Sequence, residues 1–157
     1  MYNRVDTVPY PFFHLDLPKA QYQWLLDGRS MTARLQRQYG VKPKVELISA
    51  AWEYPDSVEI ALLGLNPNML CWVRQTQISC HDEKILSARS VIPPSLLKGK
   101  YRYLRRLGER SLGNVLFASK STIREEVMLN SSNDVIERCS IFRLGKNKLL
   151  LREYFDS

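Results

Sequence analysis

The hydrophobic period of this chain changes near residue 44. Before that point, apolar residues recur at helical spacing over 18–27 and again over 31–39, with Asp16 able to cap the first segment and Gly40 placed to end the second. Beyond it, β-branched and apolar runs are separated by turn residues, as in strands. The change predicts two short helices followed by antiparallel strands, which is an α+β architecture.

Two pairs of apolar runs predict hairpins. Runs 69–80 and 85–92 are joined by the polar turn CHDEK, and runs 135–144 and 149–155 are joined by GKNK. With a further strand over 45–52, we expect a single antiparallel β-sheet covered by helices.

Composition limits the number of domains and the class of protein. The chain has 157 residues, 45% of them hydrophobic, which suffices for one core, so residues 1–157 are expected to form a single domain. We expect no integral membrane segment because the longest apolar run is far below the roughly 18 residues that a bilayer crossing needs. The N-terminal residues do not resemble a signal peptide, which predicts a cytoplasmic location.

Most of the positive charge lies in one segment. The net charge is +7, and residues 98–110 carry six basic side chains against one glutamate, which accounts for five of those seven charges. We expect this segment to be a helix with Tyr103, Leu104 and Leu107 facing inward and its arginines, Arg102, Arg105 and Arg106, facing out. A solvated basic face explains the charge better than nucleic-acid binding, so no nucleic-acid partner is expected.

Strand alternation brings two charges to the apolar side of the sheet. Arg74 shares a strand face with Trp72 and Ile78, and Glu153 shares one with Leu151. A buried charge needs a partner or a ligand. Either the two side chains pair with each other, or they flank a pocket and hold opposite ends of a small anion; alternation alone leaves both open.

Other sequence signals are weak. His14 and His81 are the only histidines and are expected to be solvated, while the odd set Cys71, Cys80 and Cys139 is expected to form free thiols. The sequence contains neither a metal-ligand spacing nor a glycine-rich phosphate loop, so we expect no metal and no cofactor.

Five segments then occur in order along the chain: LLDGRSMTARLQRQ at 25–38, WVRQTQISC at 72–80, ARSVIP at 88–93, RRLGERSLGNVLF at 105–117 and RLGKNKLLLREYF at 143–155. Together they resemble the chorismate pyruvate-lyase family, which makes 4-hydroxybenzoate from chorismate as the first committed step toward ubiquinone. The resemblance implies a lyase with chorismate as substrate, 4-hydroxybenzoate and pyruvate as products, and a monomeric antiparallel sheet with a closed internal site.

The resemblance also implies roles for four residues. The arginine that binds the ring carboxylate falls on Arg74, and the acidic site residue falls on Glu153, which either takes a proton or only positions the substrate. Met31 and Leu112 fall where main-chain amides help to hold the ring carboxylate.

Some features stay open at this stage. The chain has Gln75 where the family leads us to expect glutamate, and Ala88 where better-known members have glycine, so the methyl group of Ala88 would tighten the pocket wall and affect product release. The alternative function is a noncatalytic small-molecule sensor of similar fold, in which Arg74 and Glu153 would be ligand contacts.

Overall fold

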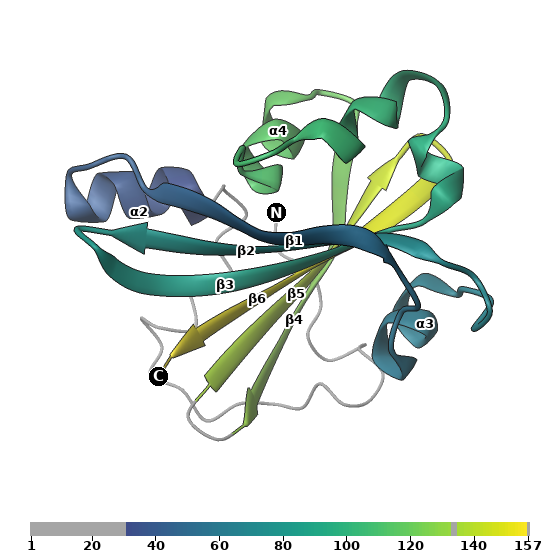
Figure 1. Ribbon diagram of the computed structural model, residues 1–157, viewed down its shortest axis with the longest axis horizontal. Coiled ribbons are helices and arrows are strands. Elements are labelled where there is room, and N and C mark those ends of the chain that lie inside the picture. Colours follow the sequence, from purple (N-terminus) through teal and green to yellow (C-terminus); the bar gives the residue numbers. More distant parts are fainter. Residues whose placement is uncertain (1–30, 133–134, 157) are drawn as a thin grey trace.

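Six antiparallel strands form one continuous sheet in the computed structural model, which describes residues 31–132 and 135–156. The strands are β1 (Lys44–Glu53), β2 (Cys71–Cys80), β3 (Glu83–Ile92), β4 (Thr122–Ser132), β5 (Val135–Leu144) and β6 (Asn147–Asp156). Their spatial order is β1-β2-β3-β6-β5-β4, so two three-stranded meanders are joined where β3 pairs with β6. The sheet twists strongly across this junction (Figure 1).

Helices cover the two faces unequally. On one face, here called the inner face, lie α2 (Met31–Tyr39), η1 (Pro94–Leu97), η2 (Gly99–Arg106) and α4 (Leu112–Ala118). The other face, the outer face, packs against α3 (Ser57–Leu63), which lies across the sheet from α4 (Figure 1). The α+β class and the single antiparallel sheet covered by helices are therefore confirmed.

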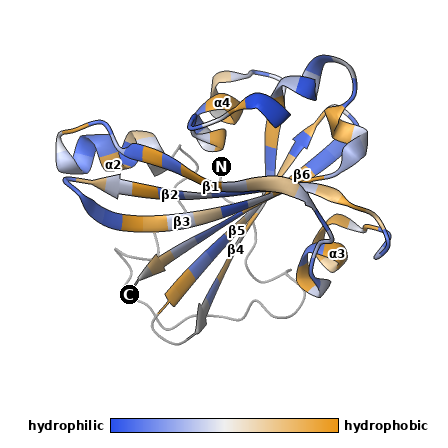
Figure 2. Ribbon diagram, viewed as in Figure 1, coloured by the Kyte–Doolittle hydropathy of each residue, from blue (hydrophilic) through white to orange (hydrophobic). Residues whose placement is uncertain are grey.

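Apolar and polar residues alternate along the strands (Figure 2), and each face of the sheet carries a hydrophobic core. The inner core includes Leu35 of α2, Leu116 of α4 and Phe142 of β5. The outer core is smaller and includes Val73, Val91 and Leu150, with Val58 and Leu62 of α3 packed against it.

The cysteines follow the same alternation. Cys80 belongs to the inner core, whereas Cys71 and Cys139 belong to the outer core. All three are buried free thiols, as expected. Burial and the nearby Glu59 carboxylate raise the pKa of Cys71 to about 11, so its thiol stays protonated at neutral pH.

Several predicted elements are confirmed. The helix over 31–39 and both hairpins are present, and the first hairpin turns through His81 and Asp82, which both have positive φ. His81 is exposed, as expected. The predicted helix over 18–27, its capping residue Asp16 and the second histidine, His14, lie outside the described residues.

The basic segment differs from its prediction in one respect. It forms the 3₁₀ helix η2, which has three residues per turn, so Tyr101, Leu104 and Leu107 share the buried side. The prediction that Tyr103 faces inward is wrong: this side chain is 37% exposed, because the prediction used the α-helical spacing of 3.6 residues. None of the helices in the described residues has the length and apolar character that a membrane crossing requires.

Candidate active site

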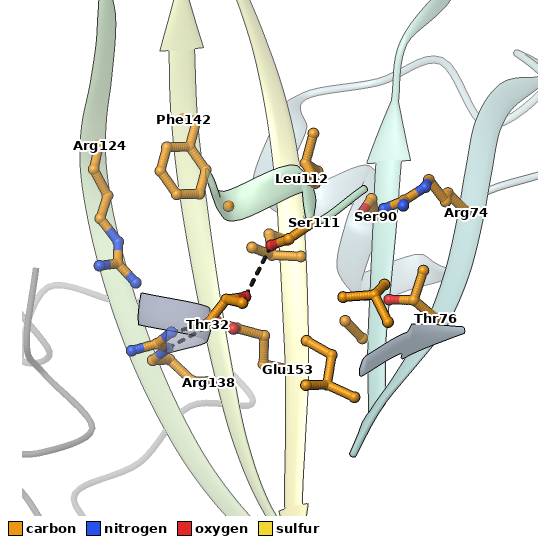
Figure 3. A pocket seen from close by; sticks show the side chains of 15 residues that line it. Thr32, Arg74, Thr76, Ser90, Ser111, Leu112, Arg124, Arg138, Phe142 and Glu153 are labelled. Carbon is orange, nitrogen blue, oxygen red and sulfur yellow. Dashed lines mark hydrogen bonds and ion pairs between the residues drawn. The ribbon is translucent and has the colours of Figure 1, made fainter. Parts of the chain in front are cut away.

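A pocket lies between the inner face of the sheet and helices α2 and α4. Its polar wall comes from β2, β3, β4, β5 and β6, and Thr32 of α2 and Ser111 at the start of α4 cover it on the side away from the sheet (Figure 3). The empty space among the lining side chains is about 460 Å³, with open solvent at the mouth included. Arg74 and Glu153 both line this pocket, as do Leu112 and Ala88.

Strand register explains why these residues meet. Thr76, Ala88, Glu153 and Arg138 are successive partners across β2, β3, β6 and β5, so their side chains form one row on the inner face. Arg74 belongs to the next row, two residues along β2. Because β3 separates β2 from β6, the strands that carry Arg74 and Glu153 are about 10 Å apart.

Arg74 is held by the main chain of the loop before α4. Its Nη2 donates to the carbonyl of Gly108 at 2.8 Å and also to the carbonyl of Arg110. The side chain is buried, and its Nε–H has no hydrogen-bond acceptor among the described residues. Burial, with the positive charge of Arg110 nearby, lowers the pKa of Arg74 to about 10, so the guanidinium stays charged at neutral pH.

Glu153 pairs with Arg138 and not with Arg74. Nε and Nη2 of Arg138 donate to Oε1 of Glu153 at 2.9 and 2.7 Å, and both side chains are buried. Glu153 Oε2 has no partner within residues 31–132 and 135–156. The reading in which Arg74 and Glu153 form a structural ion pair with each other is therefore wrong, because each has other partners.

The two positions expected to offer main-chain amides lie at helix starts. Met31 is the first residue of α2, directly before Thr32, and Leu112 is the first residue of α4, directly after Ser111. The hydroxyl oxygens of Thr32 and Ser111 are 2.9 Å apart and form a hydrogen bond that links the two helices over the pocket (Figure 3).

The two departures from the family pattern lie on opposite faces. Ala88 lines the pocket directly beside Glu153 in the register, so its methyl group forms part of the wall, as expected. Gln75 is half-buried and lies in a separate groove with Ile48 and Tyr154. The position of Gln75 therefore does not bear on the pocket.

Sequence reasoning missed two arginines of the pocket, Arg138 on β5 and Arg124 on β4. Arg124 Nη2 donates to Ser140 Oγ at 2.7 Å, and its guanidinium lies 5.5 Å from the centre of the Phe142 ring. The alternation of Ile136, Arg138, Ser140 and Phe142 along β5 is the signal by which Arg138 could have been found.

A second ionic cluster lies on the outer face. Glu59 of α3 is fully buried. Its carboxylate accepts hydrogen bonds from Arg89 at 2.7 and 2.9 Å and from Arg152 at 3.1 Å. Arg152 also donates to Glu137 and to Asp56. Burial acts to raise the pKa of Glu59, but hydrogen bonds from Arg89, the Asp56 amide and Arg152 outweigh it and lower the pKa. This cluster fastens α3 to the sheet and faces away from the pocket.

Within the described part of the chain, no three histidine, cysteine, aspartate or glutamate side chains are grouped so that they could hold a metal ion. The pocket instead offers cations, one carboxylate and hydroxyl groups. These groups suit an organic anion that also carries a hydroxyl.

Comparison with known proteins decides the family. The model of the chorismate lyase family matches residues 13–156. This chain belongs to the chorismate lyase family. Relatives in the family include the chorismate pyruvate-lyase of Erwinia tasmaniensis, which is 34% identical over 132 residues, covering 84% of this chain and 75% of that protein. The chorismate pyruvate-lyase of an Enterobacter species is 33% identical over 139 residues, covering 88% of this chain and 84% of that protein.

Two solved structures of another protein, PhnF, have a fold similar to that of this chorismate lyase family member. The effector domain of PhnF from Mycobacterium smegmatis has a TM-score of 0.57 at 13% identity, covering 82% of this chain and 89% of that chain. A second structure of PhnF has a TM-score of 0.59 at 13% identity, covering 84% of this chain and 65% of that chain. At this identity the likeness concerns the fold alone.

Proposed function

We propose that this protein is a lyase that converts chorismate to 4-hydroxybenzoate and pyruvate. The observation that carries the proposal is that Arg74 and Glu153, the two residues that match the family's site, line the same buried pocket of a chain that belongs to the chorismate lyase family.

The protein needs to contribute little to this reaction, because most of the driving force lies in the chemistry of the substrate itself. The ether bond at C3 of the ring breaks, the hydrogen at C4 is lost, and the enolpyruvyl group gains a hydrogen and leaves as pyruvate. The ring becomes aromatic, and no water, metal or redox cofactor enters the balance. Orientation and electrostatic stabilisation are the contributions that remain for the pocket.

Arg74 is the proposed anchor of the ring carboxylate. One of its nitrogens holds the carbonyls of Gly108 and Arg110, while its buried Nε–H lacks an acceptor among the described residues. A carboxylate is the acceptor that a guanidinium binds best. The amides of Met31 and Leu112, at the starts of α2 and α4, are proposed to complete this end of the site.

Glu153 is the proposed acidic residue at the C4 end. Arg138 occupies Oε1, which leaves Oε2 to contact the C4 hydroxyl or to take the C4 proton. In a pericyclic route the C4 hydrogen moves directly to the enolpyruvyl methylene, and Glu153 only positions and polarises the substrate. In both routes Arg138 is a positioning residue that fixes the carboxylate.

The direct test is to incubate the purified protein with chorismate and to measure both products. We expect 4-hydroxybenzoate and pyruvate in equal amounts, at the same rate with and without EDTA. Activity that disappears in EDTA and returns with a divalent ion would overturn the metal-free mechanism. Binding of chorismate without turnover would instead support the sensing function.

The proposal includes the setting in which the protein acts. We propose a cytoplasmic monomer without a nucleic-acid partner, as the family resemblance and the local distribution of charge suggest. Gel filtration with light scattering would test the monomer, since a dimer would elute with twice the mass of 18.3 kDa.

A further inference from the structure

The pocket has a second cationic side, opposite Arg74. Figure 3 shows Arg124 and Arg138 together at one side of the pocket, Arg74 at the other, and Glu153 between them. Arg124 reaches this place from β4, and its guanidinium is oriented by the Ser140 hydroxyl and the Phe142 ring. Nothing in the roles described above uses Arg124.

The charges of the pocket suggest a ligand with two negative groups. The described lining residues include three guanidinium groups and one carboxylate. Arg138 and Glu153 neutralise each other through their hydrogen bonds at 2.9 and 2.7 Å. The described lining therefore has guanidinium groups on two opposite sides, with Arg74 on one side and Arg124 and Arg138 on the other.

The substrate of the proposed reaction has its negative groups in a matching arrangement. Chorismate carries one carboxylate on C1 of the ring and a second on the enolpyruvyl group, which is bonded through oxygen to C3. C4 lies opposite C1 and next to C3. If Arg74 holds the C1 carboxylate and Glu153 faces C4, the enolpyruvyl carboxylate lies on the side of Glu153, where another negative charge requires a cation.

We propose that Arg124 binds the carboxylate of the enolpyruvyl group, an inference that rests on the proposed lyase function. Arg124 then holds the fragment that leaves as pyruvate. Negative charge develops on the ether oxygen of that fragment as the C3–O bond breaks, and a nearby guanidinium stabilises this charge. The product 4-hydroxybenzoate lacks this carboxylate, so its binding does not use Arg124.

The experiment compares two ligands in five proteins. Steady-state kcat/KM for chorismate and the Kd for 4-hydroxybenzoate are measured for the parent, Arg124→Gln, Arg124→Lys, Arg74→Gln and Arg143→Gln. Arg143 is the matched control, since it also projects from the sheet and pairs with Glu125 at 2.7 Å but does not line the pocket.

We expect Arg124→Gln to lower kcat/KM by about tenfold to a hundredfold, the loss typical of one charge-assisted interaction, while the Kd for 4-hydroxybenzoate stays within about twofold of the parent value. Arg74→Gln should lower kcat/KM for chorismate and raise the Kd for 4-hydroxybenzoate, and Arg143→Gln should change neither value. Arg124→Lys, which keeps the charge but not the two-pronged geometry, should recover part of the loss.

Two results would overturn the assignment of Arg124. One is an unchanged kcat/KM in Arg124→Gln, and the other is an equal loss for chorismate and 4-hydroxybenzoate, which indicates a structural role. If Arg124→Gln does not fold, Arg124→Lys gives the same comparison with a smaller expected loss. A parent protein that does not turn over chorismate contradicts the lyase function itself, which separates the two failures.

Discussion

The buried charges of Arg74 and Glu153 have different kinds of partner. Glu153 has a cation, Arg138, within hydrogen-bond distance, so its charge is compensated before any ligand arrives. Arg74 is held by neutral carbonyl groups, so the buried positive charge lacks a counter-ion among its described contacts. A bound carboxylate would supply one, and ligand binding is therefore expected to stabilise the protein chiefly through Arg74.

Substitution should separate the two roles. We expect Arg74→Ala to raise the KM for chorismate and the Kd for 4-hydroxybenzoate, because it removes the partner of the ring carboxylate. Glu153→Gln should lower kcat by about a hundredfold or more, the usual range for acid–base groups, with a smaller change in affinity. Steady-state kinetics and titration with 4-hydroxybenzoate measure both effects.

Thermal melting must accompany these measurements, since Glu153→Gln breaks the buried pair with Arg138, and breaking such a pair costs about 3–5 kcal/mol. If both variants stay folded and turn over chorismate at the parent rate, the residues are structural and the site lies elsewhere.

The sequence predicted part of the candidate site, and physical reasons explain the rest. The alternation of side chains along a strand predicted that Arg74 and Glu153 lie on the buried face, where the structure places them. The same argument applied to β5 would have identified Arg138. Arg124 could not be found in this way because the β4–β5 register shifts between Arg124 and Glu126, which interrupts the alternation. The partners of Arg74 are main-chain carbonyls, which no residue pattern reveals.

At the scale of elements, α3 shows how a short helix is fixed by its ends. Asp56 accepts from the Glu59 amide at 2.9 Å and Glu59 accepts from the Asp56 amide at 3.0 Å, which is a capping box. Gly64 ends the helix with φ of 64°. A helix of seven residues is unstable alone, so its attachment to the sheet through Glu59 matters.

This attachment predicts a pH effect. The pKa of Glu59 lies below its ordinary value of 4.5, so its contribution to stability is complete above that pH and is lost as the pH falls through the lowered pKa. Glu59→Gln should reduce the free energy of unfolding at pH 7 by about 3–5 kcal/mol, because it leaves Arg89 and Arg152 without this buried partner. The variant should also lose less stability than the parent below pH 4.5.

Urea unfolding at pH 7 and at several lower values measures both quantities. Glu46→Gln is the control, because Glu46 is an exposed carboxylate on β1 for which little change is expected. A Glu59→Gln variant with the parent's stability and pH dependence would show that α3 is held by its apolar contacts alone.

The elements that sequence analysis missed have weak local patterns. The segment that forms α3 lies between two runs of turn residues, and only the Asp56–Glu59 spacing and Gly64 mark its ends. β4 contains charged residues and a register shift, so its apolar residues do not alternate regularly. Both elements are stabilised by tertiary contacts, which the sequence pattern does not contain.

At the scale of the whole molecule, the arginines of η2 have two kinds of surroundings. Arg105 lies over the rings of Trp52 and Trp72, with its guanidinium 5.3 and 4.8 Å from their centres, and so fastens η2 to β1 and β2. Arg102 and Arg106 are exposed, and Arg102 Nε donates to the main-chain carbonyl of Gly99 within the same helix. The arginines of this segment are therefore not equivalent.

Chorismate is a dianion, so a positive surface can raise its rate of encounter. Replacing Arg102 and Arg106 with glutamine should leave kcat unchanged and weaken the salt dependence of kcat/KM, since salt screens over about 8–10 Å. Arg105→Gln, which removes the same charge per residue but also the contact with two tryptophans, should lower thermal stability. Kinetics at several salt concentrations and melting curves test both statements.

A nucleic-acid function predicts another outcome. The parent would bind DNA or RNA with a steep dependence on salt, and the Arg102/Arg106 variant would bind less tightly. Anisotropy titrations that show tight binding by the parent at physiological salt would contradict the proposed absence of a nucleic-acid partner.

The pairing of β3 with β6 also determines when the pocket can exist during synthesis and folding. The first meander, residues 44–92, supplies Arg74, and the second, residues 122–156, supplies Arg124, Arg138 and Glu153. A nascent chain that has formed only the first meander holds one side of the pocket without the other. Closing the loop between the meanders costs more entropy than forming either hairpin, so activity should emerge only with this long-range step.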